Sequence, residues 1–222
     1  MIKRNVPNFL TCGNILTGTF GIVEVFNGNF SSAIYYVLIA AGFDFLDGMA
    51  ARVLKVSSPM GKELDSFADM VSFGALPSLY LYTFLMKAEY QVAPLLALLI
   101  VAFSAWRLAK FNIDDRQSDK FIGLPTPANA IMITATAFLI IELHEALWIL
   151  LIAGSCLLLV ANLEMLALKF KNLSLRANIW RYGLVLTAVA LILVFGKMGI
   201  VMVIPTYILL SLVANFTSKS SV

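Results

Sequence analysis

Long apolar stretches alternate with short polar connections along nearly the whole chain. A helix needs about 20 mostly apolar residues to cross the hydrocarbon core of a bilayer, and eight stretches approach that length. They cover roughly residues 8–27, 30–51, 66–86, 92–111, 123–141, 146–168, 179–196 and 199–216. Short connections favour antiparallel neighbours in a bundle. We therefore expect an all-α polytopic membrane protein with about eight transmembrane helices, in which residues 1–222 form one integral membrane domain.

The composition supports a lipid environment. Of the 222 residues, 60% are hydrophobic and only 13% are charged, whereas a soluble domain is about half apolar and about a quarter charged. The basic residues are scattered between the apolar stretches, so no nucleic-acid partner is expected. Cys12 and Cys156 each lie within an apolar stretch, which is typical of small buried residues and not of a disulfide or a metal pair.

The basic residues predict an orientation in the membrane. If the N-terminus is placed in the cytoplasm, 14 of the lysines and arginines fall on the cytoplasmic side, and only Lys87 and Lys197 fall on the other. Cytoplasmic connections are normally the ones enriched in Lys and Arg. We therefore expect both termini in the cytoplasm, with the second apolar segment ending, and the third beginning, at the cytoplasmic surface.

Four aspartates flank that cytoplasmic turn. Asp44 and Asp47 lie three positions apart, and Asp65 and Asp69 lie four apart, so each pair shares a helix face. Residues 53–60 between them contain a Ser-Ser-Pro sequence that favours a turn. Charges within membrane segments are costly and indicate function. The sequence thus predicts a helical hairpin that gathers four carboxylates at one rim of the bundle.

Four neighbouring carboxylates repel one another unless cations neutralise them. Hard oxygen ligands suit Mg²⁺, Mn²⁺ or Ca²⁺ and do not suit zinc, and two such ions can bridge phosphate oxygens. Gly48 and Ala51 leave room for a ligand, and Arg52 can neutralise a phosphate. A lone aspartate near a helix end is usually interfacial, and small residues usually serve helix packing. The coincidence of all these features favours a metal-dependent phosphate site.

The same residues carry a resemblance to a known family. The pattern D-x2-D-G-x2-A-R-x8-G-x3-D-x3-D is occupied at every position, by Asp44, Asp47, Gly48, Ala51, Arg52, Gly61, Asp65 and Asp69. It resembles the signature of the CDP-alcohol phosphatidyltransferase family. Residues 43–52, 60–69, 71–74, 107–112 and 121–127 are similar to a bacterial and archaeal branch, the phosphatidylserine synthases. The resemblance covers roughly residues 5–130, and the last third of the chain offers only hydrophobicity.

The resemblance implies both a fold and an activity. It implies a six-helix core with extra helices, a homodimer, and an active site that opens to the cytoplasm from the cell membrane. The implied substrates are CDP-diacylglycerol and L-serine, and the products are phosphatidylserine and CMP. The catalytic hairpin would span about residues 43–74.

The resemblance also implies roles for individual residues. The four aspartates would bind divalent cations, two Mg²⁺ or Mn²⁺ ions with Ca²⁺ as another possible occupant, and Asp69 would be the general base. The residues implied to line the CDP site are Gly48, Ala51, Arg52 and Gly61. Asn8 and Thr11 resemble a polar pair that helps to hold the nucleotide, although both could equally cap the first helix.

Serine as acceptor adds a requirement for a cation that faces its carboxylate. Arg107 and Lys110 are the candidates, and the alternative is ordinary snorkelling of both side chains to the interface.

Two rival functions remain open at this point. One is the same transfer to glycerol phosphate or inositol phosphate. The other is divalent-cation transport, which is disfavoured because transport sites usually lie near the bilayer midplane, whereas these acids lie at one rim.

Overall fold

The structure is a computed structural model that describes residues 2–113, 121–139, 142–166 and 178–219. Within these ranges the chain is helical except for one short pair of strands. Three helical stretches are long and apolar enough to cross a membrane, Asn5–Phe26, Ala93–Ile113 and Lys197–Asn215, and two shorter apolar helices accompany them. The chain is thus an all-helical, polytopic membrane protein, as its composition predicts.

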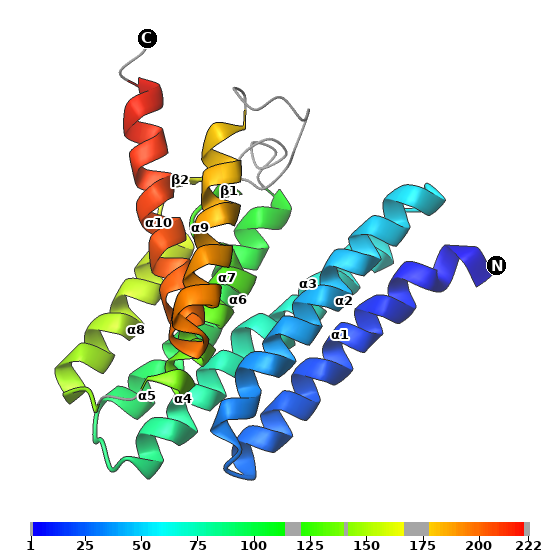
Figure 1. Cartoon of the computed structure of the whole chain (residues 1–222). Coiled ribbons are helices and arrows are strands. Elements are labelled where there is room, and N and C mark those ends of the chain that lie inside the picture. The colour runs from blue at the N-terminus through cyan, green and yellow to red at the C-terminus, as the bar shows by residue number, and fades with distance from the viewer. Residues whose placement is uncertain (1, 114–120, 140–141, 167–177, 220–222) are drawn as a thin grey trace.

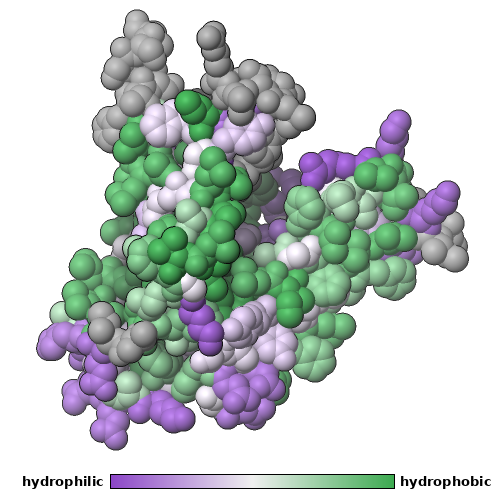
Figure 2. All heavy atoms as spheres, in the orientation of Figure 1, coloured by the Kyte–Doolittle hydropathy of each residue, from purple (hydrophilic) through white to green (hydrophobic). Residues whose placement is uncertain are grey.

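The helices form a bundle whose two halves diverge toward one end. The elements in chain order are α1 (Ile2–Phe26), the 3-10 turn η1 (Phe30–Ser32), α2 (Ala33–Leu54), α3 (Pro59–Asp69), the π-helix η2 (Met70–Ala75), α4 (Leu76–Lys87), α5 (Ala93–Ala97), α6 (Leu99–Ile113), β1 (Phe121–Ile122), α7 (Thr126–Ala135), the 3-10 turn η4 (Thr136–Phe138), α8 (Glu145–Val160), β2 (Glu164–Met165), α9 (Ile179–Phe195) and α10 (Lys197–Lys219). In Figure 1, α1, α2 and α3 lean away from α6 to α10, and both chain ends lie toward the upper end of the bundle. The space-filling view in Figure 2 shows a hollow between these two groups of helices.

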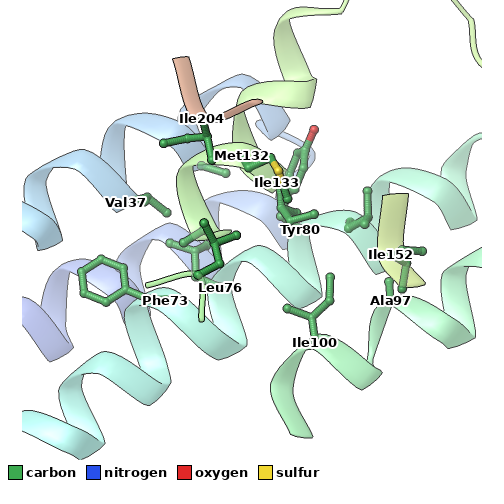
Figure 3. Close-up of a cluster of buried hydrophobic side chains, with 14 of the residues drawn as sticks. Val37, Phe73, Leu76, Tyr80, Ala97, Ile100, Met132, Ile133, Ile152 and Ile204 are labelled. Carbon is green, nitrogen blue, oxygen red and sulfur yellow. The ribbon is translucent and has the colours of Figure 1, made fainter. Parts of the chain in front are cut away.

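The core lies where the two groups meet. Phe73, Leu76 and Tyr80 from the η2–α4 stretch are fully buried, and they pack with α7 residues such as Ile133 and with Ile204 of α10 (Figure 3). The Tyr80 hydroxyl is paired with the Thr136 hydroxyl at 3.0 Å, so this buried polar group is satisfied. This packing fixes α3, through η2 and α4, against the rest of the bundle.

The predicted hairpin between α2 and α3 forms for local reasons. Helix α2 ends at Leu54 because Lys55 adopts a left-handed conformation, with φ of 51°, and its N–H returns to the carbonyls of the last turn. Ser58 then caps α3 by accepting the N–H of Gly61 at 2.9 Å, and Pro59 occupies the first turn. The predicted turn at 53–60 is therefore confirmed.

A π-helical turn follows the last aspartate of the hairpin. Residues Met70–Ala75 connect α3 to α4 without a break, and the Ser72 hydroxyl donates to the backbone carbonyl of Asn14 on α1 at 3.0 Å. Such wide turns alter the register of a helix and are frequent at functional sites. Here the wide turn separates the polar face that carries Asp65 and Asp69 from the buried apolar residues of α4.

The sixth apolar segment ends earlier than its hydrophobicity predicts. Helix α8 stops at Val160, and the chain then forms β2, antiparallel to β1, with Ile122 opposite Glu164. Gly123 follows β1 with φ of +77°, and a Cβ at this position would lie 2.7 Å from the carbonyl oxygen of Leu159, so a side chain has no space here. Hydrophobic periodicity does not predict the pairing of β1 with β2, because the two strands are far apart in the sequence.

Candidate active site

The hairpin brings its carboxylates together. Asp44 and Asp47 of α2 and Asp65 of α3 each present one oxygen atom, and these atoms all lie within 4.8 Å of one another. Asp69, one turn further along α3, interacts electrostatically with all three. The sequence placed these four aspartates on facing helices, and the structure gathers them into one acidic cluster.

The acidic cluster is suited to a hard cation. Asp65 lies just before the predicted membrane segment, and burial, together with repulsion from the Asp47 carboxylate, raises its pKa to about 6. One oxygen of Asp65 and one of Asp69 are buried without a hydrogen-bond partner among the described residues. Buried carboxylate oxygens need a partner or a cation. The donor set, made of oxygen atoms alone, fits Mg²⁺, Mn²⁺ or Ca²⁺.

Helix α1 orients one member of the acidic cluster. The Thr11 hydroxyl lies 2.7 Å from Oδ2 of Asp47 and 3.0 Å from the carbonyl oxygen of Pro7, and both Thr11 and Asp47 are buried. A hydroxyl that donates to a carboxylate holds it in one rotamer and stabilises its charge. Thr11 therefore contacts the acidic cluster through Asp47, and it does not cap the start of α1, which begins at Ile2.

A pocket of about 220 Å³ opens beside the acidic cluster. It is lined by Pro7, Asn8, Thr11, Asp47, Gly48, Ala51, Val56, Ser57, Ser58, Gly61, Lys62 and Asp65. Five of the six residues that the resemblance assigned to a nucleotide are in this lining. A Cβ on Gly61 would lie 3.1 Å from both the Asn8 side-chain oxygen and the Ser58 hydroxyl. A side chain at Gly61 would therefore crowd this part of the pocket lining.

Arg52, the sixth of these residues, does not line the pocket. Its side chain is exposed, and its Nε donates to the carbonyl of Gly48 one turn earlier at 3.0 Å. A Cβ on Gly48, which lines the pocket, would lie 3.9 Å from one terminal nitrogen of the Arg52 guanidinium, so this group lies close to the pocket. Arginine in this position can present two parallel donors to a phosphate.

The two candidate cations for the acceptor occupy different environments. Arg107 of α6 is only 6% exposed, it interacts electrostatically with Asp69, and its Nε has no partner among the described residues. Lys110, in contrast, donates to the side-chain oxygen of Asn162 at 2.9 Å near the surface. Arg107 therefore interacts electrostatically with the acidic cluster, whereas Lys110 is hydrogen-bonded to the segment that follows α8.

Several contributors to the site were not predicted from the sequence. Ser58 and Lys62 line the pocket, and Lys62 also donates to the carbonyl of Asn112 at the end of α6. Asn112 in turn donates to the Ser66 hydroxyl at 2.8 Å. The Ser-Pro pair at 58–59 is a helix-start signal that could have identified Ser58. The hydrogen bonds between α3 and α6 join residues about fifty positions apart, and no local sequence pattern predicts them.

The chain is similar to known proteins over the part that contains this site. The family model described as CDP-alcohol phosphatidyltransferase matches residues 4–161, which include the hairpin, the pocket and Arg107. A protein from Bacillus subtilis named CDP-diacylglycerol–serine O-phosphatidyltransferase is 37% identical over 133 residues, covering 60% of this chain and 75% of its own length. A protein of the same name from Helicobacter pylori is 33% identical over 166 residues, covering 71% of this chain and 70% of its own.

An archaeal relative shows the same likeness. The protein of that name from Methanocaldococcus jannaschii is 38% identical over 135 residues, which is 61% of each chain. The matched family residues span more than half of the chain and contain every position of the acidic motif. The chain therefore belongs to the CDP-alcohol phosphatidyltransferase family and is an integral membrane enzyme.

Proposed function

We propose that this enzyme transfers the phosphatidyl group of CDP-diacylglycerol to L-serine, with phosphatidylserine and CMP as products. The observation that carries the proposal is the convergence of Asp44, Asp47 and Asp65 from two neighbouring helices beside a pocket that the small motif residues line. The names of the relatives support serine as the acceptor. The catalytic unit in this proposal is the hairpin at about 43–74.

The size of the pocket suits part of the polar head of the donor, and not the whole lipid. Pockets that enclose a drug-sized ligand span about 300–1,000 Å³, whereas this one holds about 220 Å³. The CDP moiety would lie against Gly48, Ala51 and Gly61, with Asn8 and Thr11 at its side. The acyl chains would remain in the lipid that surrounds the apolar helices. With the CDP moiety in the pocket and the acyl chains in lipid, the reaction would take place at the membrane surface.

The reaction requires activation of a poor nucleophile. In the proposal, Asp69 accepts the proton of the serine hydroxyl while the hydroxyl oxygen attacks the β-phosphorus, the one that bears diacylglycerol. The bond between this phosphorus and the bridging oxygen of the pyrophosphate breaks, and CMP departs with that oxygen. Two divalent cations held by the four aspartates would neutralise the phosphate oxygens, and Mg²⁺ or Mn²⁺ is the proposed occupant.

The remaining residues position the reactants. Arg52 would present its guanidinium to the pyrophosphate from the edge of α2, and Arg107 would bind the serine carboxylate beside Asp69. Lys110, which lies near the surface, would attract the anionic group of the acceptor toward Arg107. Positioning and preorganised charge supply most of the rate in such transfers, which suits an aspartate base that is intrinsically weak at neutral pH.

The orientation and assembly are part of the same proposal. Both termini and the acidic cluster would face the cytoplasm across about eight spans, because CDP and serine are water-soluble and 14 of the 16 basic residues fall on that side. The exposed apolar faces of the outer helices would meet lipid and a second copy of the chain in a homodimer. Crosslinking of the protein in native membranes tests the dimer.

The acceptor is the part of the proposal most open to test. Purified enzyme in detergent micelles, supplied with CDP-diacylglycerol and Mn²⁺, should release CMP with L-serine and far more slowly with glycerol phosphate or inositol phosphate. Phosphatidylserine should appear in equal amount to CMP. Faster release with a phosphorylated acceptor would reassign the substrate, and metal flux through proteoliposomes without CMP release would favour a transporter.

A further inference from the structure

The ammonium group of Lys62 on α3 is held by the end of α6. Its Nζ donates to the backbone carbonyl of Asn112 at 2.9 Å, and Asn112 is the last residue but one of α6. The last carbonyls of a helix have no partners within the helix and favour a nearby cation. This hydrogen bond uses one of the three N–H groups of the ammonium, so two remain for other groups.

The side chain of Asn112 closes a ring of hydrogen bonds between the two helices. Its Nδ2 donates to the Ser66 hydroxyl at 2.8 Å, and that hydroxyl donates to the backbone carbonyl of Lys62 at 3.2 Å. A lysine on a helix surface normally keeps its rotamer freedom and loses it when a ligand binds. The ammonium of Lys62 already has a partner on another helix, so less freedom is lost when it binds an anion.

Lys62 also lines the pocket beside the acidic cluster. Among the described residues that line this pocket it is the one with a positive charge, whereas Asp47 and Asp65 contribute carboxylates. Lys62 precedes Asp65 by three positions, so the two share a face of α3 about 4.5 Å apart along the helix axis. Lys62 is the nearer of the two to Ser58, which caps the start of α3. A diphosphate bound along this face would therefore meet cations at one phosphate and the ammonium at the other.

We propose that Lys62 binds the phosphate that leaves with CMP, and that Asn112 is a positioning residue that holds the Lys62 ammonium at the pocket. This inference rests on the proposed function, in which the pocket receives the CDP moiety. The phosphate that bears diacylglycerol would lie toward the acidic cluster, and the phosphate that bears cytidine toward Lys62. A lysine neutralises such a phosphate as a point charge. Neither Lys62 nor Asn112 is one of the eight motif positions.

The test compares the binding of CMP and cytidine to Lys62→Met and Lys55→Met. Each substitution removes one positive charge near the α2–α3 turn, but Lys55, which follows α2, is not among the residues that line the pocket. Calorimetry in detergent micelles with Mn²⁺ measures both affinities. Lys62→Met should lower CMP affinity about tenfold, as expected for a hydrogen bond to a charged group. Its cytidine affinity should be unchanged, because cytidine lacks the phosphate, and Lys55→Met should keep CMP affinity within about twofold.

Three results would overturn the role of Lys62. Unchanged CMP affinity in Lys62→Met, even with a lower Tm, would show that the lysine only caps α6. Equal losses of CMP and cytidine affinity would indicate a distorted pocket. An equal loss of CMP affinity in Lys55→Met would indicate a long-range effect of charge. Lys62→Arg, which keeps the charge, should retain more CMP affinity than Lys62→Met.

A double-mutant cycle tests the positioning role of Asn112. Asn112→Ala removes the bond to Ser66 but keeps the backbone carbonyl, so CMP affinity should fall about threefold, as for an ordinary hydrogen bond. The same substitution should change little in the Lys62→Met background. Additive losses, or no loss in Asn112→Ala alone, would overturn the positioning role. Wild-type protein that binds neither CMP nor cytidine would instead refute the proposed function itself.

Discussion

The hydroxyl of Thr11 lies 2.7 Å from Oδ2 of Asp47 and joins the first helix to the acidic cluster across 36 positions of sequence. Because both residues are buried, this contact determines which way one of the cluster's carboxylates points. It connects the apolar N-terminal helix, a candidate membrane span, to the proposed chemistry, and it provides the first prediction.

Replacing Thr11 with Val should lower the apparent affinity of the enzyme for its divalent cation. The loss of one hydrogen bond to a charged group costs about 1.5–3 kcal/mol, so the Mn²⁺ concentration for half-maximal CMP release should rise at least about tenfold, and Thr11→Ser should restore it. Thr17→Val is the matched control, because the Thr17 hydroxyl bonds only to the carbonyl of Gly13 on the same helix. Equal Mn²⁺ dependence in the Thr11 and Thr17 valine variants would contradict the role of Thr11.

Asp69→Asn should abolish turnover and leave much of the donor binding intact. A general base contributes about 10²–10⁴-fold, and asparagine keeps the size of the side chain without the basic oxygen. The measurement is kcat for CMP release beside equilibrium binding of CDP-diacylglycerol. Glu63→Gln, on the exposed face of the same helix, serves as the control. More than a tenth of wild-type kcat in Asp69→Asn would remove Asp69 as the base.

Gly61→Ala should impair donor binding without unfolding the protein. The added Cβ would lie 3.1 Å from the Asn8 oxygen and the Ser58 hydroxyl, so one of these side chains must move slightly and the methyl group narrows the pocket that all three residues line. We expect KM for CDP-diacylglycerol to rise several-fold with KM for serine unchanged. Gly154→Ala, where a Cβ meets no atom within 4 Å, should have no effect on either constant. A normal donor KM in Gly61→Ala would place the nucleotide elsewhere.

Removal of divalent cations should stop the reaction reversibly. The oxygen atoms of Asp44, Asp47 and Asp65 lie within 4.8 Å of one another, and without a cation their mutual repulsion disfavours a bound pyrophosphate. CMP release should fall to background in EDTA and return with excess Mg²⁺ or Mn²⁺, whereas Zn²⁺ should restore little. Full activity in chelator would refute the metal-dependent scheme.

Glu145 should make thermal stability depend on acidic pH. This carboxylate at the start of α8 accepts the N–H groups of Ala93 and Val92, and these hydrogen bonds lower its pKa. A carboxyl group whose pKa is lower in the folded state stabilises the fold above its unfolded pKa of about 4.3, and loses that contribution as pH falls through the folded value. The Tm difference between wild type and Glu145→Gln should therefore shrink below about pH 4. A Tm difference between wild type and Glu145→Gln that is constant from pH 3 to 7 would contradict this coupling. The control is Glu89→Gln, a substitution at an exposed glutamate.

Most of the helical architecture could be predicted from apolar segments, because a membrane helix is a local feature of hydrophobicity and length. The helix boundaries were less predictable. The segment expected at 146–168 ends as α8 at Val160, since β2 pairs with a distant strand. Asp44, Asp47, Asp65 and Asp69 were identified by their spacing on two consecutive helices, which a short turn must bring together.

The sequence by itself determined the lipid environment and the acid-bearing hairpin, because composition and the spacing of neighbouring residues along consecutive helices are sufficient for both. Only the tertiary structure decided that Arg107 faces Asp69 while Lys110 pairs with Asn162. It also brought the Thr11 hydroxyl of the first helix to the Asp47 carboxylate of the second. The physical reason is that contacts between distant helices depend on how whole helix faces pack, and no local pattern records that packing.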